Sequence, residues 1–455
     1  MESDYQDQPT HGSLDEDESD SVAFMLAEDF PPKFVEAATK YEILGEVGRG
    51  GVGIIYKARD CHLDRMVAIK VLRHEFRDRD DIIQRFEQEA RIISQLPHPG
   101  LAPVFECGSC SDGRPFHSMK LVEGNNLKKV IQDETFGSET RSHAVSAFAN
   151  VCQTIAYTHS RNIVHLDIKP ANIMIGTYGE VHVMDWGSAR QLDRYGKFAS
   201  VSILRTNARP PDDQLRVVGG TLEYLAPEQA AGGALDKRTD VFELGACLCH
   251  ILTGKPPYGG EGKLQIYRSA VAGDLLSAHR GLTNCNADPA LIRLAINCLQ
   301  PDPDDRPDDA REVAGAISTY QNTAFARFQS DMTRFFELSH DLFCIAALDG
   351  YFRRINSNFS RLLGHSDADL MSRPFLEFVH PDDHQKTMDV MGQLVEGRPI
   401  VRFQNRYRTA AGDYVVMEWT AKSIPEEGLI FAVARDITDV GVDRTLKQSK
   451  GSRKT

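Results

Sequence analysis

Apolar residues begin to follow a regular pattern near Tyr41, where strand-like segments precede helical ones. Runs rich in β-branched and aromatic residues, with a glycine-rich turn after the first, predict three strands over residues 41–48, 53–60 and 66–72. Apolar positions then recur with a helical period over residues 81–95, 140–160 and 225–320. Strands followed by helices predict an α+β fold built as a pair of lobes.

A second pattern begins near Asp331 and extends to about residue 440. The stretch FFELSHDLFCIAALDGYFRRIN predicts a helix and two strands joined by a DG turn. Further along, VRFQNRYRT, DYVVMEWTAKSI and LIFAVARDIT predict three strands joined by AGD and PEEG, which is typical of an antiparallel meander. These elements suit a compact domain of about 110 residues.

The ends of the chain have a different composition. Residues 1 to about 21 are acidic and poor in large apolar side chains, and the last ten residues form a basic stretch, LKQSKGSRKT. Both compositions favour disorder. The expected organisation is an acidic N-terminal segment that is mostly disordered, two folded domains and a basic C-terminal tail, over residues 1–40, 41–320, 331–440 and 441–455.

Overall composition narrows the class of protein. An apolar content of 41% suits a globular protein, and a net charge of −13 without a basic stripe argues against a nucleic-acid partner. The nine cysteines are scattered, and Cys107 and Cys110 have no second pair at zinc-ligand spacing, so free thiols in a reducing compartment are expected. An apolar signal core and a run of about 18 apolar residues are both missing, which predicts a cytoplasmic protein without a membrane span.

Three polar residues, Asp167, Lys169 and Asn172, interrupt an apolar stretch over residues 163–174. Charges in a buried segment are costly unless something pairs with them, so a charged ligand is expected here. The segments 173–175 and 181–184 predict two paired strands, which fold Asp185 back beside Asn172. A carboxylate and a carboxamide that converge beside Asp167 suit Mg²⁺, which takes few protein ligands.

Two further features lie in the first lobe. Gly48, Gly50 and Gly53 between two strands would let backbone N–H groups approach a phosphate chain, although an ordinary hairpin turn would look the same. Glu89 falls on the apolar face of the helix predicted over residues 81–95, where a carboxylate needs a cation. Lys70, at the end of the third strand, is the candidate partner.

These motifs, in this order, make residues 41 to about 320 resemble the protein kinase catalytic domain of the Ser/Thr class found in bacteria. The resemblance implies a two-lobed kinase fold, with a β-rich first lobe and a helical second lobe, that uses ATP and Mg²⁺. It implies nucleotide-binding positions at Gly48, Gly50, Gly53, Ile55, Ala68, Lys70, Met119 as gatekeeper, and Lys120 and Val122 in the adenine hinge.

The same resemblance implies the remaining roles. Lys70 and Glu89 form the ion pair that orients phosphates, and Asp167 accepts the proton of a Ser or Thr hydroxyl while Lys169 neutralises the γ-phosphoryl group. Asn172 and Asp185 hold Mg²⁺. Asp240 anchors the catalytic loop, and Arg306 pairs with Glu228 of the motif Ala226–Glu228. Protein substrates and autophosphorylation are therefore expected.

The match departs from the family at two residues. Leu166 stands where the family has an arginine that receives an activation-loop phosphate, so activity without a strict need for that phosphate is a hypothesis. Trp186 replaces the usual phenylalanine after Asp185. The long segment from Asp185 to Glu228 contains RTNARPPDDQLRV, interpreted either as a substrate or autophosphorylation loop or as a tolerated surface insertion.

Residues 331 to about 440 resemble a PAS domain through the DLFCIAALDGYFRRINSNFSRLLG, FVHPDDH and ARDIT stretches. The resemblance implies an α/β sensor that binds a small molecule or pairs two copies; His380 and His384 could ligate haem but fit ordinary scaffold positions. The phospho-accepting helix and ATPase domain of a histidine kinase are not expected after this domain. The prediction is a Ser/Thr kinase with a PAS domain, the alternatives being a pseudokinase or a PAS-based receptor scaffold without phosphotransfer.

Overall fold

The computed structural model describes residues 40–133, 135–193 and 222–438. The predicted acidic segment and basic tail, and the RTNARPPDDQLRV insertion, lie outside the described residues. The chain divides into two compact units, Met1–Gln321 and Asn322–Thr455. Among the helices that are described, none combines the length and the apolar character that crossing a membrane requires.

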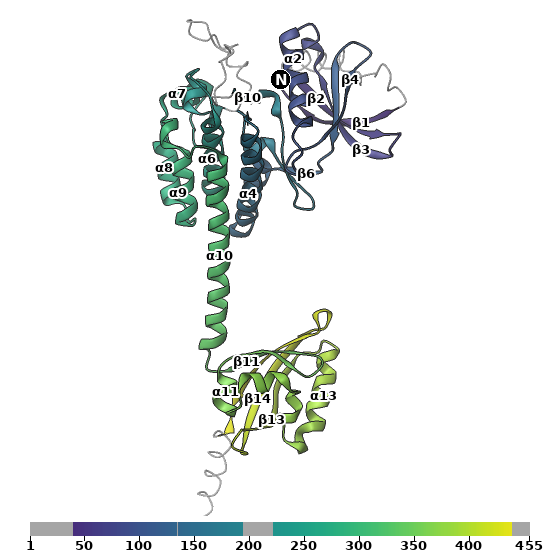
Figure 1. Cartoon of the computed structure of the whole chain (residues 1–455), viewed down its shortest axis with the longest axis vertical. Helices are drawn as coiled ribbons and strands as arrows, with labels where there is room; N and C mark the ends of the chain where they lie inside the picture. Colours follow the sequence, from purple (N-terminus) through teal and green to yellow (C-terminus); the bar gives the residue numbers. More distant parts are fainter. Residues whose placement is uncertain (1–39, 134, 194–221, 439–455) are drawn as a thin grey trace, which may run out of the picture. The chain divides into compact units, whose positions relative to one another are not determined.

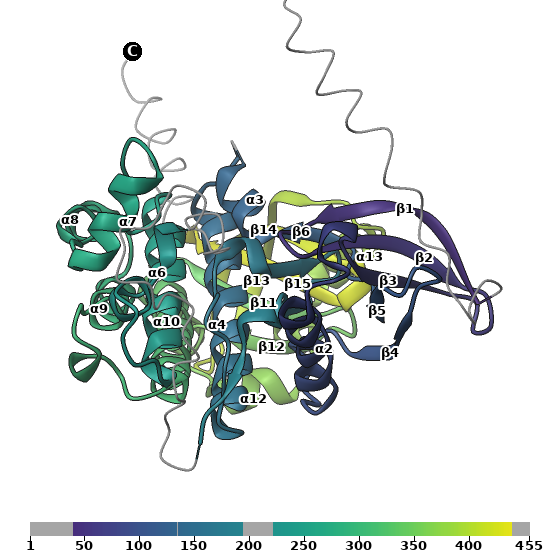
Figure 2. The same cartoon turned by 90° about the horizontal axis from the view of Figure 1, so that it is seen from above.

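The first unit begins with a five-stranded antiparallel sheet in the order β1-β2-β3-β5-β4. Alternate residues of β2 (Ile54, Tyr56 and Ala58) point into the core of this lobe. Helix α2 (Asp80–Ser94) packs against β4 and β5, as Figure 2 shows. The strands are β1 (Tyr41–Arg49), β2 (Gly53–Asp60), β3 (Arg65–Leu72), β4 (Val104–Ser109) and β5 (Pro115–Lys120).

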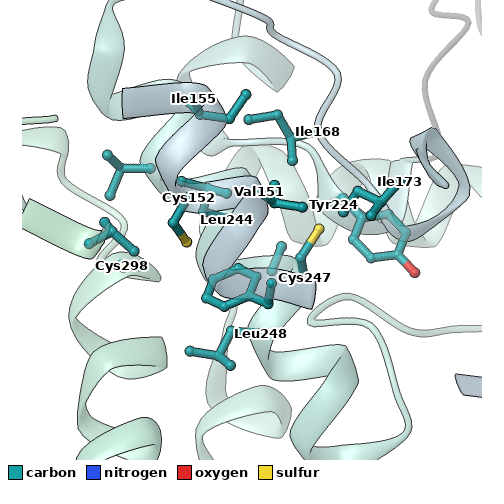
Figure 3. Packing of buried hydrophobic residues seen from close by; sticks show 14 of the residues in the cluster. Val151, Cys152, Ile155, Ile168, Ile173, Tyr224, Leu244, Cys247, Leu248 and Cys298 are labelled. Atoms are coloured by element: carbon teal, nitrogen blue, oxygen red, sulfur yellow. The ribbon is translucent and has the colours of Figure 1, made fainter. Parts of the chain in front are cut away.

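A helical lobe follows this sheet within the same unit (Figure 1). Helix α6 is buried along nearly its whole length; Asp236 caps its N-terminus and Gly254, with φ of 73°, ends it. Figure 3 shows side chains of α4 and α6 packed together in the core. The helices are α3 (Leu127–Gln132), α4 (Ser138–Ser160), α5 (Pro227–Ala230), α6 (Lys237–Thr253), α7 (Lys263–Ala272), α8 (Leu276–Asn284), α9 (Pro289–Cys298) and the first part of α10 (Ala310–Leu338), which ends in the second unit.

Two small β-ribbons present the loops between the lobes. The first joins β6 (Gly124–Asn126), β8 (Ile173–Gly176) and β9 (Val181–Val183), and the second joins β7 (Ile163–Val164) to β10 (Arg190–Gln191). Ile173 of β8 pairs with Val183 of β9, so the predicted antiparallel pairing of these segments is confirmed. Because the two strands are antiparallel, the residues just before β8 and just after β9 lie side by side.

The second unit contains a five-stranded antiparallel sheet in the order β12-β11-β15-β14-β13, with helices on one face. The predicted meander is confirmed, because β13, β14 and β15 pair successively. The strands are β11 (Leu342–Ala347), β12 (Phe352–Ile355), β13 (Ile400–Arg408), β14 (Tyr414–Ile424) and β15 (Leu429–Asp436), and the helices are α11 (Asn358–Leu363), α12 (Asp367–Ser372) and α13 (His384–Val395).

The helix between the two sequence patterns is longer than expected. The patterns suggested one helical region ending near residue 320 and another helix after Asp331, whereas α10 is one helix over Ala310–Leu338. The intervening residues, QNTAFARFQS, contain no proline or glycine that would end a helix. The predicted fold class, a two-lobed α+β unit followed by a smaller α/β unit, is confirmed.

Candidate active site

The glycine-rich turn joins β1 to β2. The backbone N–H of Gly50 donates to the carbonyl of Gly53 at 2.9 Å, which closes the turn. A Cβ atom on Gly53 would lie 3.3 Å from the side chain of Lys70 and 3.2 Å from the carbonyl of Val71. Gly53 therefore leaves room for the lysine stem beneath the turn, as the pairing of β2 with β3 requires.

Lys70, Glu89 and Asp185 form a connected charge cluster. The ammonium of Lys70 donates to both carboxylate oxygens of Glu89 at 2.7 Å, and it lies 3.5 Å from Oδ1 of Asp185. Burial opposes the charged form of Lys70, but the negative charges of Glu89 and then Asp185 outweigh it and raise the lysine pKa. Lys70 in turn lowers the pKa of Asp185. The predicted ion pair between Lys70 and Glu89 is confirmed.

The loop that carries Asp167 is anchored at four consecutive backbone N–H groups. Those of His165 and Leu166 donate to the carboxylate of Asp240, each at 2.8 Å, so the predicted anchoring role of Asp240 is confirmed. The N–H of Asp167 donates to Nδ1 of His165 at 3.2 Å, and that of Ile168 donates to Oε2 of Glu243 at 2.6 Å. Side chains therefore satisfy the backbone on both sides of Asp167.

Asp167, Lys169 and Asn172 converge within this loop. The ammonium of Lys169 donates to the two carboxylate oxygens of Asp167 at 2.9 and 2.8 Å, and the carboxamide nitrogen of Asn172 donates to the backbone carbonyl and to Oδ2 of Asp167 at 2.8 and 3.1 Å. Burial raises the pKa of Asp167 above its usual value, and the charge of Lys169 opposes that rise. The carboxyl group is held in one orientation by two donors.

Asn172 and Asp185 supply oxygen donors at the end of the β8–β9 ribbon. The backbone N–H of Met184 donates to the carbonyl of Asn172 at 2.8 Å. This bond places the next residue, Asp185, beside Asn172, as predicted. Asp185 has φ of 63°, and its side chain is half exposed. Because the carboxamide nitrogen of Asn172 donates its hydrogen bonds to Asp167, the carboxamide oxygen of Asn172 is the atom that could ligate a cation.

These donors suit Mg²⁺. Carboxylate and carboxamide oxygens are hard ligands, and Mg²⁺ takes one or two of them while water and phosphates complete its shell. The described residues contain no group of three or more His, Cys, Asp and Glu side chains that could hold a metal ion. The residues present therefore fit the predicted ion.

The residues that follow the Asp185–Glu228 segment are hydrogen-bonded to the loop that carries Asp167. Arg306 forms two hydrogen bonds with Glu228, at 2.8 and 2.9 Å, which confirms the predicted pair. The side chain of Gln229 accepts from the N–H of Ala226 at 2.9 Å and donates to the carbonyl of Leu166 at 3.0 Å. Sequence reasoning missed Gln229, although it directly follows the Ala226–Glu228 motif.

Glu243 was missed as well. Its side chain is buried, and burial raises its pKa well above the usual value, with Asp240 and Asp167 adding to the rise. A carboxylate in the otherwise apolar run VFELGACLCHIL was the available signal. A glutamate three residues after Asp240 lies on the same helix face, so the two acids can serve one loop.

The predicted adenine-hinge positions lie along β5 and after it. Ala68 of β3 pairs with Met119 of β5, and both side chains are buried. Lys120 ends β5, and its ammonium lies 3.2 Å from Nε2 of His182, a buried residue of β9 that sequence reasoning did not single out. Ile55 pairs with Lys70 across β2 and β3, and Val122 follows Lys120 in the connection to β6.

The two departures from the family pattern are both buried. Leu166 packs with Val164 and Leu192 in a small apolar cluster, and its backbone adopts φ of 64°. Trp186 is 1% exposed, donates from Nε1 to the carbonyl of Val183 at 3.0 Å, and contacts the ring of His165. Leu166 therefore presents no positive charge to the segment that follows Leu192.

The second unit encloses an apolar cavity between its sheet and helix α13. Asn405 and Thr387 are the main polar residues of its lining, and Asn405 is already hydrogen-bonded to Thr387 and to the indole of Trp419. His380 accepts from the N–H of Asp382, and His384 donates to the carbonyl of Val379. Neither histidine lines the cavity, which favours scaffold roles over haem ligation for both.

Comparison with known proteins gives two family matches. The family described as protein kinase domain matches residues 41–316, and the PAS fold family matches residues 352–433. Serine/threonine-protein kinase PknB of Mycobacterium tuberculosis (strain ATCC 25618 / H37Rv) is 34% identical over 290 residues, which cover 62% of this chain and 43% of that protein. Serine/threonine-protein kinase PrkC of Bacillus subtilis (strain 168) is 33% identical over 280 residues, covering 62% of this chain and 40% of PrkC. The chain thus spans less than half the length of these curated relatives.

Proposed function

The chain belongs to the protein kinase family, and from this membership and the site geometry we propose that it transfers the γ-phosphoryl group of ATP to serine and threonine hydroxyls of proteins. Its own serines and threonines are a further class of acceptor. The acceptor preference follows from the similarity to serine/threonine kinases and from the lysine two residues after Asp167.

One observation carries the proposal. The Lys70–Glu89–Asp185 cluster and the Asp167–Lys169–Asn172 cluster are joined through the β8–β9 ribbon, where Met184 bonds to Asn172. Phosphoryl transfer needs positioned charges more than covalent chemistry. An ammonium, a pair of oxygen donors for Mg²⁺ and a hydroxyl-orienting carboxylate are the groups this reaction uses.

Asp167 would orient the acceptor hydroxyl and take its proton. Its carboxylate is fixed by Lys169 and Asn172, so the base is held in place before substrate binds. Lys169 would move its charge toward the phosphoryl oxygens as negative charge develops there, and Lys70 would hold the α- and β-phosphates. Bound Mg²⁺ would neutralise the phosphate charge, held by Asn172 and Asp185.

In this proposal the second unit regulates the kinase unit. It belongs to a fold that binds small molecules or pairs two copies, and its cavity is lined mostly by apolar side chains. We place it as a module that modulates the kinase unit through a small ligand or through pairing. The pseudokinase alternative gains nothing from the site, because each charged residue expected for transfer is present and partnered.

The test is incorporation of labelled phosphate from ATP into a protein acceptor in the presence of Mg²⁺. Asp167→Asn should lower the rate at least about 100-fold, because it removes the proton acceptor while keeping the shape of the side chain. Asp78→Asn, at a side chain that is 85% exposed and pairs with Arg77 rather than with a site residue, is the matched control and should label as the unmodified chain does. Equal labelling of the Asp167→Asn variant and the unmodified chain would refute the proposal.

A further inference from the structure

The peptide bond between Leu166 and Asp167 is held at both of its polar atoms. Its carbonyl, which belongs to Leu166, accepts a hydrogen bond from Nε2 of Gln229 at 3.0 Å. Its N–H, which belongs to Asp167, donates to Nδ1 of His165 at 3.2 Å. Because a peptide unit is planar, these two bonds fix the orientation of the plane that ends at the Cα atom of Asp167.

The backbone of Leu166 adopts a conformation that needs such support. Its φ of 64° lies in the left-handed region, which a bulky side chain rarely occupies. A residue persists in this region where the surrounding contacts over-determine its conformation. The N–H of Leu166 is bound by Asp240 at 2.8 Å, and its carbonyl is bound by Gln229. One of these contacts therefore comes from the long helix α6 and the other from the short helix α5.

Gln229 is suited to this contact because its carboxamide serves two backbone groups of opposite kind. Its Oε1 accepts from the N–H of Ala226 at 2.9 Å, as the third residue of a helix does when it reaches back to the N-cap. Since the oxygen is committed there, the amide nitrogen is the end that faces the Leu166 carbonyl. A carboxylate could keep the first bond but has no hydrogen to give to the second.

Helix α5, which carries Gln229, is itself tied to the helical lobe. Glu228 forms two hydrogen bonds with Arg306, whose side chain is fully buried. The hydroxyl of Tyr267 on α7 donates to the carbonyl of Ala230 at 2.9 Å. Gln229 therefore extends from a fixed turn, so its contact can hold the loop that carries Asp167 rather than follow it.

A second contact of Gln229 involves the other side of Asp167. Burial raises the pKa of Glu243, and a hydrogen bond from Gln229 is among the contacts that oppose this rise. Glu243 in turn accepts from the N–H of Ile168 at 2.6 Å. The carboxamide of Gln229 thus contacts both the residue before Asp167 and the acid that binds the residue after it.

We propose that Gln229 is a positioning residue for phosphoryl transfer, which couples helix α5, at the end of the Asp185–Glu228 segment, to the orientation of Asp167. The coupling runs through the Leu166 carbonyl to the peptide unit that ends at Asp167. Because Gln229 acts through another residue, it should affect the rate of transfer and not the affinity for ATP. The effect on rate rests on the kinase function proposed above, whereas the effect on the loop does not.

Gln229→Glu separates this role from that of a helix cap. Glutamate keeps the acceptor for the Ala226 N–H but loses the donor to Leu166, so kcat should fall about 10- to 100-fold while the KM for ATP changes less than about twofold. A residue that only capped α5 would leave kcat unchanged in this variant, and that result would overturn the proposal.

Two further variants exclude an effect of the added charge. Gln229→Met, uncharged and of similar length, should lose as much kcat as Gln229→Glu; full activity would overturn the proposal. Gln265→Glu is the matched control, because Gln265 on α7 is exposed and also accepts from a backbone N–H, that of Glu261 at 3.1 Å. It should leave kcat unchanged, and a comparable loss in Gln265→Glu and Gln229→Glu would contradict the role of Gln229.

Amide hydrogen exchange tests the contact without phosphotransfer. In the full chain without nucleotide, Gln229→Glu and Gln229→Met should each raise the exchange rate of a peptide covering residues 163–169 about tenfold or more. Peptides of α6 should exchange as in the unmodified chain, which checks that the fold is retained. If the unmodified chain transfers no phosphate, the kinase proposal fails while this measurement still decides whether Gln229 holds the loop. Unchanged exchange over residues 163–169 in both variants would overturn the positioning role.

Discussion

The carboxyl group of Glu243 on α6 accepts a hydrogen bond from the backbone N–H of Ile168 at 2.6 Å, immediately after Asp167. Together with Asp240, which holds the N–H groups of His165 and Leu166, it fixes the peptide units on both sides of Asp167. Helix α6 lies in the middle of the helical core (Figure 3). The orientation of Asp167 is therefore set by a rigid element, with Glu243 as a positioning residue.

Glu243→Ala should lower kcat about 10- to 100-fold with little change in the KM for ATP, because the loop loses an anchor while the nucleotide contacts remain. Glu243→Gln should retain most of the activity, because glutamine keeps a carbonyl oxygen that can accept from the N–H of Ile168 and because burial already raises the pKa of the Glu243 carboxyl well above its usual value. Steady-state kinetics measure both. Glu312→Ala, at an exposed site on α10, is the control. A change confined to KM, or equal loss in the Ala and Gln variants, would argue against positioning.

Substitution of every Ser and Thr over residues 188–206 by alanine should leave most of the kinase activity. The reason is that Leu166 occupies the position at which a kinase that depends on an activation-loop phosphate has an arginine. Its side chain packs with Val164 and Leu192 and carries no charge that could bind a phosphate. Phosphate transfer to an external protein substrate measures the effect. Loss of nearly all turnover would show that a phosphorylated residue in this segment is needed after all.

Removal of Mg²⁺ by a chelator should abolish transfer, and Asp185→Asn should raise the Mg²⁺ concentration needed for half-maximal rate about 10- to 100-fold. The substitution replaces a carboxylate by a neutral carboxamide, which is a weaker ligand, and removes the negative charge that Lys70 contacts at 3.5 Å. A Mg²⁺ titration at fixed ATP measures the shift, with Asp78→Asn as the control. An unchanged titration curve would remove Asp185 from the metal site.

The second unit should lose stability below about pH 4 through Asp383. Its buried carboxylate accepts from the backbone and guanidinium of Arg406 at 2.8 to 2.9 Å, and these bonds hold the pKa of Asp383 well below its usual value. A carboxyl group whose pKa is lower in the folded state stabilises above its unfolded pKa of about 3.9, and this contribution disappears as the pH falls through the folded pKa.

Asp383→Asn should therefore destabilise the second unit by about 2 kcal/mol at pH 7 and weaken its acid sensitivity. In a Trp186→Phe background, Trp419 is the remaining tryptophan and reports unfolding of this unit in urea. An equal loss of stability for Asp383→Asn at pH 7 and pH 3 would contradict the assignment. Asp413→Asn, at an exposed turn of the same unit, is the matched control.

Much of the candidate site could be predicted because its signals are local. The ribbon that returns Asp185 to Asn172 joins strands a few residues apart, and the ion pair of Lys70 with Glu89 follows from a charge on an apolar helix face. The contact of Glu243 with Ile168 was not predicted, because it joins residues 75 positions apart and depends on how α6 packs beneath the loop.

The sequence alone therefore determined the order of strands and helices, the identity of the charged residues and the family pattern, since periodicity, turn residues and motif spacing are properties of neighbouring positions. Tertiary structure decided that Leu166 is enclosed by Leu192 and that Gln229 reaches the carbonyl of Leu166. Burial and long-range hydrogen bonds depend on which surfaces meet, and no single segment encodes that.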